Sequence, residues 1–127
     1  MLSNLVIENI AIIEYASIDF TDGFNCLTGE TGAGKSIIID SINAVLGEKT
    51  SRELIRTGES SARVSALFTD ITPASCIALD EAGIACEDGC VRIVRTLQRD
   101  GRNICKINSV GVSVSTLKKI GITLINI

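Results

Sequence analysis

The sequence contains no histidine and no tryptophan, and it has one proline, three phenylalanines and one tyrosine. Without histidine, the common mixed Cys/His zinc sites are impossible. The five cysteines are an odd number with no Cys-x-x-Cys pair, which favours free buried thiols over a disulfide framework or a metal site. Cys86 and Cys90 are still close enough in the chain to approach each other. Free thiols are typical of a reducing compartment, so we expect a cytoplasmic protein.

An excess of basic residues is also lacking. The chain has 12 basic and 15 acidic residues, a net charge of −3 and a pI near 4.9. This balance excludes a strongly basic nucleic-acid module held by bulk charge, although it leaves room for a local basic patch. No run reaches the ~18 apolar residues of a membrane span, and Glu8 and Glu14 interrupt the apolar N-terminus. We therefore expect neither a signal peptide nor contact with a membrane.

The length of 127 residues and the 46% of apolar residues fit a single domain over residues 1–127. Apolar runs and turn signals predict strands at 5–7, 12–20, 24–28, 63–68, 90–97, 102–107 and 123–127. Helical patterns predict helices at 35–46, from Pro73 to about residue 82, and at 115–120, with a polar loop at 48–61. Thr72 is the expected N-cap of the second helix, and Gly47 the expected C-cap of the first. The fold class is therefore α/β.

Residues 29–36 form the motif that gives the clearest indication of function. They match G-x-x-x-x-G-K-[ST] at every fixed position, through Gly29, Glu30, Thr31, Gly32, Ala33, Gly34, Lys35 and Ser36. Glycines allow consecutive backbone N–H groups to surround phosphate oxygens, and the following helix adds its unpaired N-terminal donors. Lys35 places a point charge on the β- and γ-phosphates, and the Ser36 hydroxyl is a hard ligand for Mg²⁺. The alternative to a binding site is a glycine-rich turn that only connects two elements. The motif lies between an expected strand and an expected helix, which favours nucleotide binding. The sequence therefore predicts binding of ATP with Mg²⁺.

Several segments resemble the RecN family, bacterial ATPases of DNA double-strand-break repair that are related to the SMC group. The resemblance rests on Leu5-Val-Ile-x-Asn-Ile10, Asp22-Gly23, Leu27 to Ser36, Ile39-Asp40, Leu46-Gly47-Glu48, Ile55-Arg-x-Gly58, Asp100-Gly-Arg102, Ile107-Asn108, Leu117-Lys118 and Gly121-x-x-Leu124-Ile125. It implies an ABC-type P-loop NTPase head lobe in which antiparallel strands lie beside the phosphate-binding strand and helix. The chain would be the N-terminal part of such a head, ending just before the Q-loop.

The resemblance also implies what the parent protein does. It would hydrolyse ATP between two engaged heads of a homodimer, bind DNA through the full-length protein, and lie in the cytoplasm in association with the nucleoid. The Walker B carboxylates, the signature motif and the Q-loop of the family are not in this sequence, so no catalytic residue is assigned and turnover by this chain alone is left open. The family's Ile-Asn-Gly-Arg is replaced by Ile107-Asn-Ser-Val110. Alternatives are a nucleotide-binding or interaction module without turnover, and an unrelated P-loop kinase or helicase.

Charged residues outside the motif permit two interpretations. The segment 92–106 contains Arg92, Arg95, Arg99, Arg102 and Lys106 with one acid, Asp100. A solvated strand face is the favoured interpretation, and phosphate contacts with DNA are the alternative. Arg52 and Arg56 resemble the arginine loop of SMC-type heads, where an arginine approaches nucleotide or DNA phosphates. Asp40 and Glu48 follow no apolar strand, so we expect them to be structural or exposed rather than catalytic.

Overall fold

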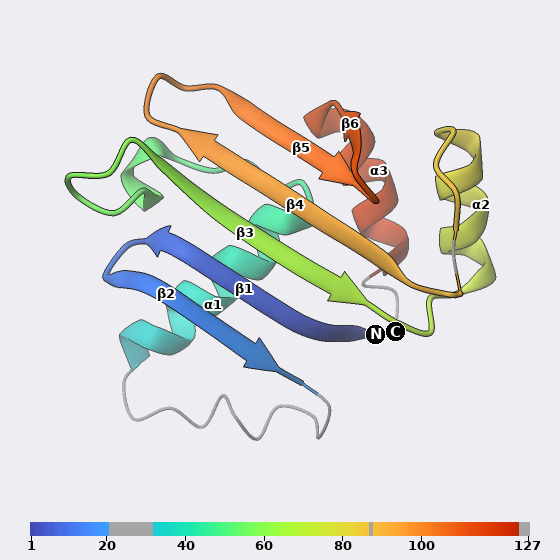
Figure 1. The fold of residues 1–127 in the computed structure, drawn as a ribbon, viewed down its shortest axis with the longest axis horizontal. Coiled ribbons are helices and arrows are strands. Elements are labelled where there is room, and N and C mark those ends of the chain that lie inside the picture. Colours follow the sequence, from blue (N-terminus) through green and yellow to red (C-terminus); the bar gives the residue numbers. More distant parts are fainter. Residues whose placement is uncertain (21–31, 87, 125–127) are drawn as a thin grey trace.

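The computed structural model describes residues 1–20, 32–86 and 88–124, with side chains of the first helix described from Ser36 onward. It contains one six-stranded antiparallel sheet of order β2-β1-β3-β4-β5-β6 (Figure 1). The strands are β1 (Leu2–Ile10), β2 (Ile13–Asp19), β3 (Ser61–Phe68), β4 (Val91–Gln98), β5 (Asn103–Ile107) and β6 (Val110–Val112). The helices are α1 (Gly32–Val45), the short 3₁₀ helix η2 (Arg52–Leu54), α2 (Pro73–Glu81) and α3 (Val114–Leu124).

The helices lie on one side of the sheet. Helix α1 packs across β1, β3 and β4, α3 packs against β5, and α2 contacts α3 beyond the edge of the sheet (Figure 1). The opposite face of the sheet carries no helix in the part of the chain that the structure describes. In those same residues no helix has the length and apolar character needed to cross a membrane. The expected α/β lobe with antiparallel strands is confirmed.

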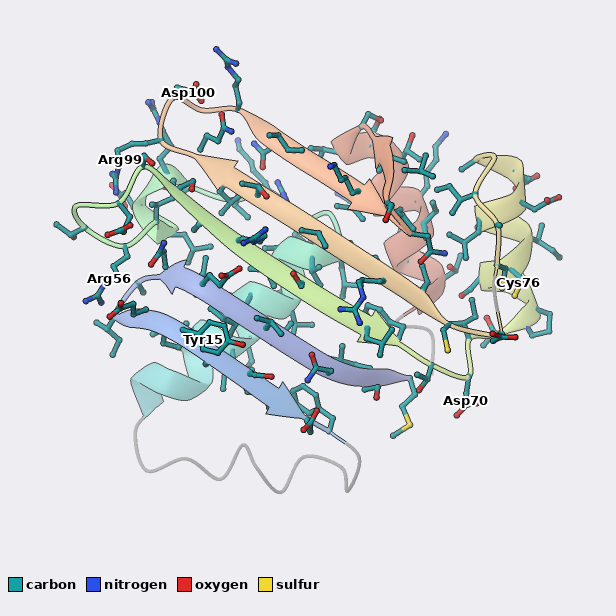
Figure 2. All side chains as sticks on the ribbon, in the orientation of Figure 1. Tyr15, Arg56, Asp70, Cys76, Arg99 and Asp100 are labelled. Atoms are coloured by element: carbon teal, nitrogen blue, oxygen red, sulfur yellow. The ribbon has the colours of Figure 1, made fainter. Side chains whose placement is uncertain are left out.

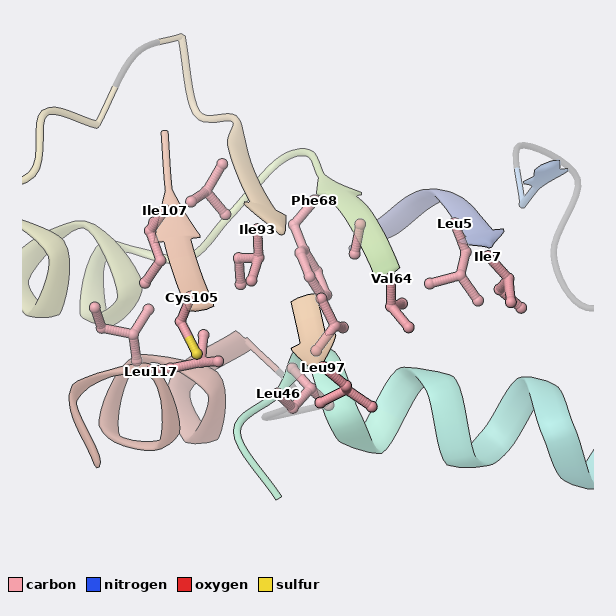
Figure 3. Packing of buried hydrophobic residues seen from close by; sticks show 14 of the residues in the cluster. Leu5, Ile7, Leu46, Val64, Phe68, Ile93, Leu97, Cys105, Ile107 and Leu117 are labelled. Carbon is pink, nitrogen blue, oxygen red and sulfur yellow. The ribbon is translucent and has the colours of Figure 1, made fainter. Parts of the chain in front are cut away.

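The core consists of strand side chains that point, at every second position, toward the helices. Leu5 and Ile7 on β1, Val64 on β3 and Ile93 on β4 all face the helices and are almost completely buried (Figure 3). Leu117 of α3 closes the core over β5. Because a side chain on a strand points to the opposite face from its neighbour, the residues between these positions lie on the face without helices.

Helix α1 is about half buried from Ser36 onward. Ile37, Ala44 and Val45 face the sheet, whereas Ile39 is 50% exposed. Ser41 also lies on the buried side, and its hydroxyl donates to the Ile37 carbonyl at 2.8 Å. Among the described side chains of α1, Ser41 is the polar one that is buried, and this bond satisfies its hydroxyl.

The end of α1 crosses α3 at two glycines. Gly47 has φ of +94°, which terminates the helix as predicted, and its α-carbon lies directly against the backbone of Lys118. Gly121 in α3 lies equally close to the backbone of Leu46. A β-carbon at Gly121 would overlap the Leu46 carbonyl oxygen, so the two helices approach closely only because this residue is glycine.

The C-terminal elements differ from the sequence-based expectation. A strand was predicted at 123–127, but Thr123 and Leu124 belong to α3. Gly121 does not stop the helix, and the Thr123 hydroxyl donates to the Ile120 carbonyl at 2.6 Å, one turn earlier. Strand β6 was not predicted; it follows a tight turn in which Asn108 and Ser109 both have positive φ. The predicted strand 24–28 and residues 125–127 lie outside the described residues.

Candidate nucleotide-binding site

The phosphate-binding motif leads into the first turn of α1. Gly29, Glu30 and Thr31 lie outside the described residues, whereas α1 begins at Gly32 and includes Gly34 and Lys35 in its first turn. The Ser36 side chain is exposed, so its hydroxyl is open to a metal ion. The helix begins three residues earlier than predicted, because boundaries are the least certain part of an element assigned from sequence. An N-terminal helical turn made of these residues fits the backbone donors and hydroxyl that a magnesium-bound triphosphate requires.

A buried arginine holds the other end of α1. Arg95 on β4 is 2% exposed, and its Nη1 donates to the carbonyls of Ala44, at 2.8 Å, and Glu48. Its Nε donates to Asn103 Oδ1 at 3.0 Å. Desolvation lowers the pKa of Arg95 from its ordinary value, yet a guanidinium keeps its charge throughout the working range of pH. A cation at this position complements the negative end of the helix dipole and adds donors to carbonyls at the helix end, of which that of Ala44 also accepts from the Gly47 N–H at 3.1 Å.

A second arginine fixes the connection between α1 and β3. Arg99 donates from Nε to the Glu59 carbonyl at 2.8 Å and from Nη2 to the Arg56 carbonyl at 3.0 Å. The same connection pairs with the β1–β2 turn through a bridge between Ile10 and Ile55. Two arginines, one near each end of this connection, therefore hold it against the sheet.

Arg52 and Arg56, the expected arginine loop, both lie in this connection. Arg52 donates from Nη1 to the Arg99 carbonyl at 3.2 Å, and Arg56 donates from Nη1 to the Ile12 carbonyl at 3.0 Å. Figure 2 shows Arg56 and Arg99 at the same end of the sheet. A guanidinium has five N–H donors, so these bonds are compatible with a phosphate contact.

The basic segment 92–106 is not one solvated face, so the sequence interpretation is wrong for Arg95. Strand alternation divides the residues: Arg95 faces the helices, whereas Arg92 and Lys106 are exposed on the opposite face. Arg102 is at the hairpin tip, where it forms an exposed ion pair with Asp100 at 3.1 Å. The burial of Arg95 could be inferred from the sequence, because Arg95 alternates in step with the apolar Val91, Ile93 and Leu97 and so points to the same face of the strand.

The two carboxylates that could have suggested catalysis are both exposed. Asp40 lies on the outer side of α1, and Glu48 follows the helix end. Glu48 contributes its backbone carbonyl to Arg95, rather than its side chain. Both therefore have the structural or exposed position that the sequence predicted.

Four of the five cysteines lie among the described residues, and all four are free thiols. A hydrogen bond with the Cys76 thiol, together with burial, raises the pKa of Cys86 above its ordinary value. Cys105 on β5 is 3% exposed, and burial raises its pKa, although Arg95 on the neighbouring strand opposes the shift. Within the described part of the chain, no group of three or more metal-binding side chains is arranged to hold an ion.

Cys105 predicts a pH dependence of stability. Because its folded pKa lies above the unfolded value of ~8.5, the stability that it contributes is complete below about pH 8.5. This contribution is lost as the pH rises through the raised folded pKa, since the unfolded thiol ionises first. A Cys105→Ala variant should be less stable than the wild type at neutral pH, by about 1 kcal/mol. The difference should shrink with rising pH in urea unfolding, and a constant difference would contradict the assignment.

Solved structures with a similar fold show the fold class to which this chain belongs. The chain superimposes with a TM-score of 0.72 on a protein from a study titled "Structural biochemistry of ATP-driven dimerization and DNA stimulated activation of SMC ATPases", at 23% identity, covering 97% of this chain and 78% of that one. It also matches the SMC head domain from Thermotoga maritima (TM-score 0.65, 24% identity, 93% of this chain and 41% of that chain). The structure of the recombination mediator protein RecF with ATPrS gives a TM-score of 0.69 at 16% identity. This match covers 92% of this chain and 29% of the RecF chain. The fold is thus that of an ABC-type P-loop NTPase head.

Sequence comparison narrows the class to a family. A family model described as an AAA domain matches residues 4–127, so the chain belongs to the AAA domain family. It is 42% identical to the DNA repair protein RecN of Halalkalibacterium halodurans, over the whole chain and 23% of that protein. It is 38% identical to RecN of Bacillus subtilis, over the whole chain and 22% of that protein. The predicted resemblance to RecN is confirmed, and the chain spans less than a quarter of the length of these relatives.

Proposed function

We propose that this chain is the ATP-binding N-terminal part of the head of a RecN-like ATPase that acts in DNA double-strand-break repair and recombination. The observation that carries the proposal is the Walker A motif, which opens the helix packed across the sheet of an ABC-type head. Similarity over the whole of this chain to the corresponding part of DNA repair proteins named RecN adds the biological setting. The confirmed family disfavours an unrelated kinase or helicase.

Residues 29–36 have distinct roles in the proposed site. Backbone N–H groups from Gly29 to Gly34 hold phosphate oxygens, Lys35 neutralises the β- and γ-phosphates, and Ser36 contributes one ligand to Mg²⁺. The magnesium ion, when bound, screens the phosphate charge. Arg52 and Arg56 lie on a connection that Arg99 fixes in place, and we include them as the arginine loop that approaches phosphates.

The whole protein would use this site in a larger assembly. Hydrolysis needs an oriented water molecule and charge placed where the transition state develops, and the eight residues of the motif supply only ground-state contacts and one metal ligand. We therefore propose that two heads of a homodimer engage around ATP, that the protein acts on DNA, and that it lies in the cytoplasm near the nucleoid.

Nucleotide binding can be tested with Lys35→Ala. The variant should lose at least about tenfold in ATP affinity in the presence of Mg²⁺, because a charge-assisted bond contributes about 1.5–3 kcal/mol. Isothermal titration calorimetry measures the affinity, and circular dichroism checks the fold. Lys49→Ala is the matched control, since Lys49 is an exposed lysine just beyond the other end of the helix. Equal ATP binding by wild type and Lys35→Ala would refute the proposed site.

A further inference from the structure

The connection between α2 and β4 runs back alongside the helix that it leaves (Figure 1). Gly83, with φ of +77°, reverses the chain directly after α2, and the Ile84 N–H donates to the Leu79 carbonyl at 2.9 Å. The Ile84 side chain is buried in the core, which holds the returning chain close to the helix. Cys86, two residues further on, therefore lies within reach of α2.

Three cysteines are close together in this region. Cys76 lies near the start of α2 (Figure 2), Cys86 is on the returning connection, and Cys90 directly precedes β4. The thiols of Cys76 and Cys86 are in hydrogen-bonding contact, and Cys90 is near enough to Cys86 to act on it electrostatically. All three side chains are half-buried, so a small solute can reach their sulfurs, whereas Cys105 is closed to it at 3% exposure.

Hydrogen bonds anchor the backbone on both sides of the contact between Cys76 and Cys86. In the first turn of α2, the Ser75 hydroxyl donates to the Thr123 hydroxyl of α3 at 3.0 Å. On the returning connection, the Ala85 carbonyl accepts from Asn108 Nδ2 at 3.0 Å. The two thiols are thus brought together by the fold of the chain around them.

Two thiols in contact are the precursor of a disulfide. An S–S bond is about 2 Å long, so rotation of half-buried side chains can close the remaining gap. Within the described residues, these thiols have no further metal-binding side chain placed to complete an ion site. We propose that Cys76 and Cys86 are a redox-sensitive pair, which a hydroperoxide converts into an intramolecular disulfide. Under reducing conditions the pair is in the dithiol form, so the disulfide is a transient modification.

The oxidation has two steps. One thiolate attacks an oxygen of hydrogen peroxide, so that an S–O bond forms, the O–O bond breaks, and the leaving hydroxide takes up a proton and departs as water. The second sulfur then attacks the resulting sulfenic acid; the S–S bond forms, the S–O bond breaks, and a second water leaves with the thiol proton. The two sulfurs lose two electrons, which the peroxide gains. A dithiol reductant reverses the modification by thiol–disulfide exchange.

Peptide mapping of the 127-residue chain provides the test. A protease that cleaves before aspartate separates the three cysteines, because Asp70, Asp80 and Asp88 each precede one of them. The reduced chain is treated with hydrogen peroxide at about pH 8, where part of a thiol population is ionised, and the remaining thiols are alkylated. After digestion, mass spectrometry should find residues 70–79 joined to residues 80–87, with residues 88–99 separate. Dithiothreitol should release both joined peptides as free thiols.

Serine variants identify the two sulfurs. Cys76→Ser and Cys86→Ser should each lose the joined peptide completely, while circular dichroism confirms that both remain folded. Cys90→Ser is the matched control: Cys90 is also half-buried, but its thiol donates to the Asp88 carbonyl at 3.5 Å, so this variant should form the disulfide at the wild-type rate.

Several results would overturn the proposal. They are a link from Cys86 to Cys90 or to a second chain in place of Cys76, loss of the joined peptide in Cys90→Ser, and peroxide products confined to sulfinic acid on single cysteines. Folded chain whose thiols remain unoxidised at millimolar peroxide would overturn it equally. Each of these results leaves the proposed ATP site untouched, because calorimetry with ATP measures that site separately.

Discussion

Replacing Arg95 with methionine should lower the free energy of unfolding by about 2–4 kcal/mol. Methionine retains much of the apolar stem but provides no donor, so the carbonyls of Ala44 and Glu48 lose the guanidinium N–H that they now accept. Asn103 loses its bond from Nε as well. Hydrogen bonds to a charged group contribute about 1.5–3 kcal/mol each, and the variant loses several of them, although the Ala44 carbonyl keeps its bond from the Gly47 N–H at 3.1 Å. Urea unfolding followed by circular dichroism measures it.

Two further variants show whether the loss of the buried guanidinium causes the expected fall in the free energy of unfolding. Arg102→Met removes an exposed arginine from the adjacent hairpin tip, and it should change stability by no more than about 0.5 kcal/mol. Arg95→Lys keeps the charge but not the planar fork, so its stability should lie between those of the wild type and Arg95→Met. If Arg95→Met is as stable as Arg102→Met, the helix end does not depend on this arginine.

Gly121→Ala should destabilise the chain by about 1–3 kcal/mol, even though alanine is the better helix former. The new methyl group would overlap the carbonyl of Leu46, which is backbone and cannot rotate away. Helix α3 would therefore have to move away from the end of α1, and the packing of Leu117 over β5 would loosen. The midpoint of denaturant unfolding is the measurement.

Gly111→Ala provides the comparison for Gly121. A β-carbon at Gly111 would meet nothing within 4 Å, so we expect a change of only a few tenths of a kcal/mol. Equal stability of the two alanine variants would show that the close contact between the helices is not needed.

Apolar periodicity was sufficient to predict most of the sheet. The strands at 12–20, 63–68, 90–97 and 102–107, and the helix that begins at Pro73, were all found close to their observed bounds. Thr72 caps that helix as predicted, accepting from the Ser75 N–H at 3.2 Å. These elements have strong local signals: alternating side chains, turn residues between strands, and a capping residue before a proline.

The remaining elements depend on tertiary contacts. Strand β6 has only three residues, and its pairing with β5 supports it more than any local preference does. The helix predicted at 115–120 continues through Gly121 to Leu124, and a glycine is needed there because the neighbouring helix end leaves no space for a larger residue. Alternation along β4 already indicates that Arg95 is buried, but its carbonyl partners, about fifty residues earlier in the chain, follow only from the fold.

The phosphate-binding residues are predicted for a different reason. The chemistry proposed for them depends on a short continuous segment, so residue types and spacing are enough to propose it. The thiol pair instead combines Cys76 on α2 with Cys86 on the connection that follows, and only the reversal of the chain at Gly83 brings them together. A charge count along the sequence groups Arg95 with Arg92, whereas the fold places them on opposite faces of the sheet.

The pairing of β1 with β3 has a consequence for the order of events during synthesis. Strand β1 lies between β2, its neighbour in sequence, and β3, which ends at Phe68. The ribosome adds about 5–20 residues per second, so roughly 3–12 s pass between the synthesis of Ile10 and that of Phe68. During this interval one edge of β1 has no partner strand, and the phosphate-binding segment is synthesised within the loop that β3 will close. Closing a loop of this length carries an entropic cost, so the β1–β2 hairpin can form early, while α1 can complete its packing on the sheet only after β3 has been added.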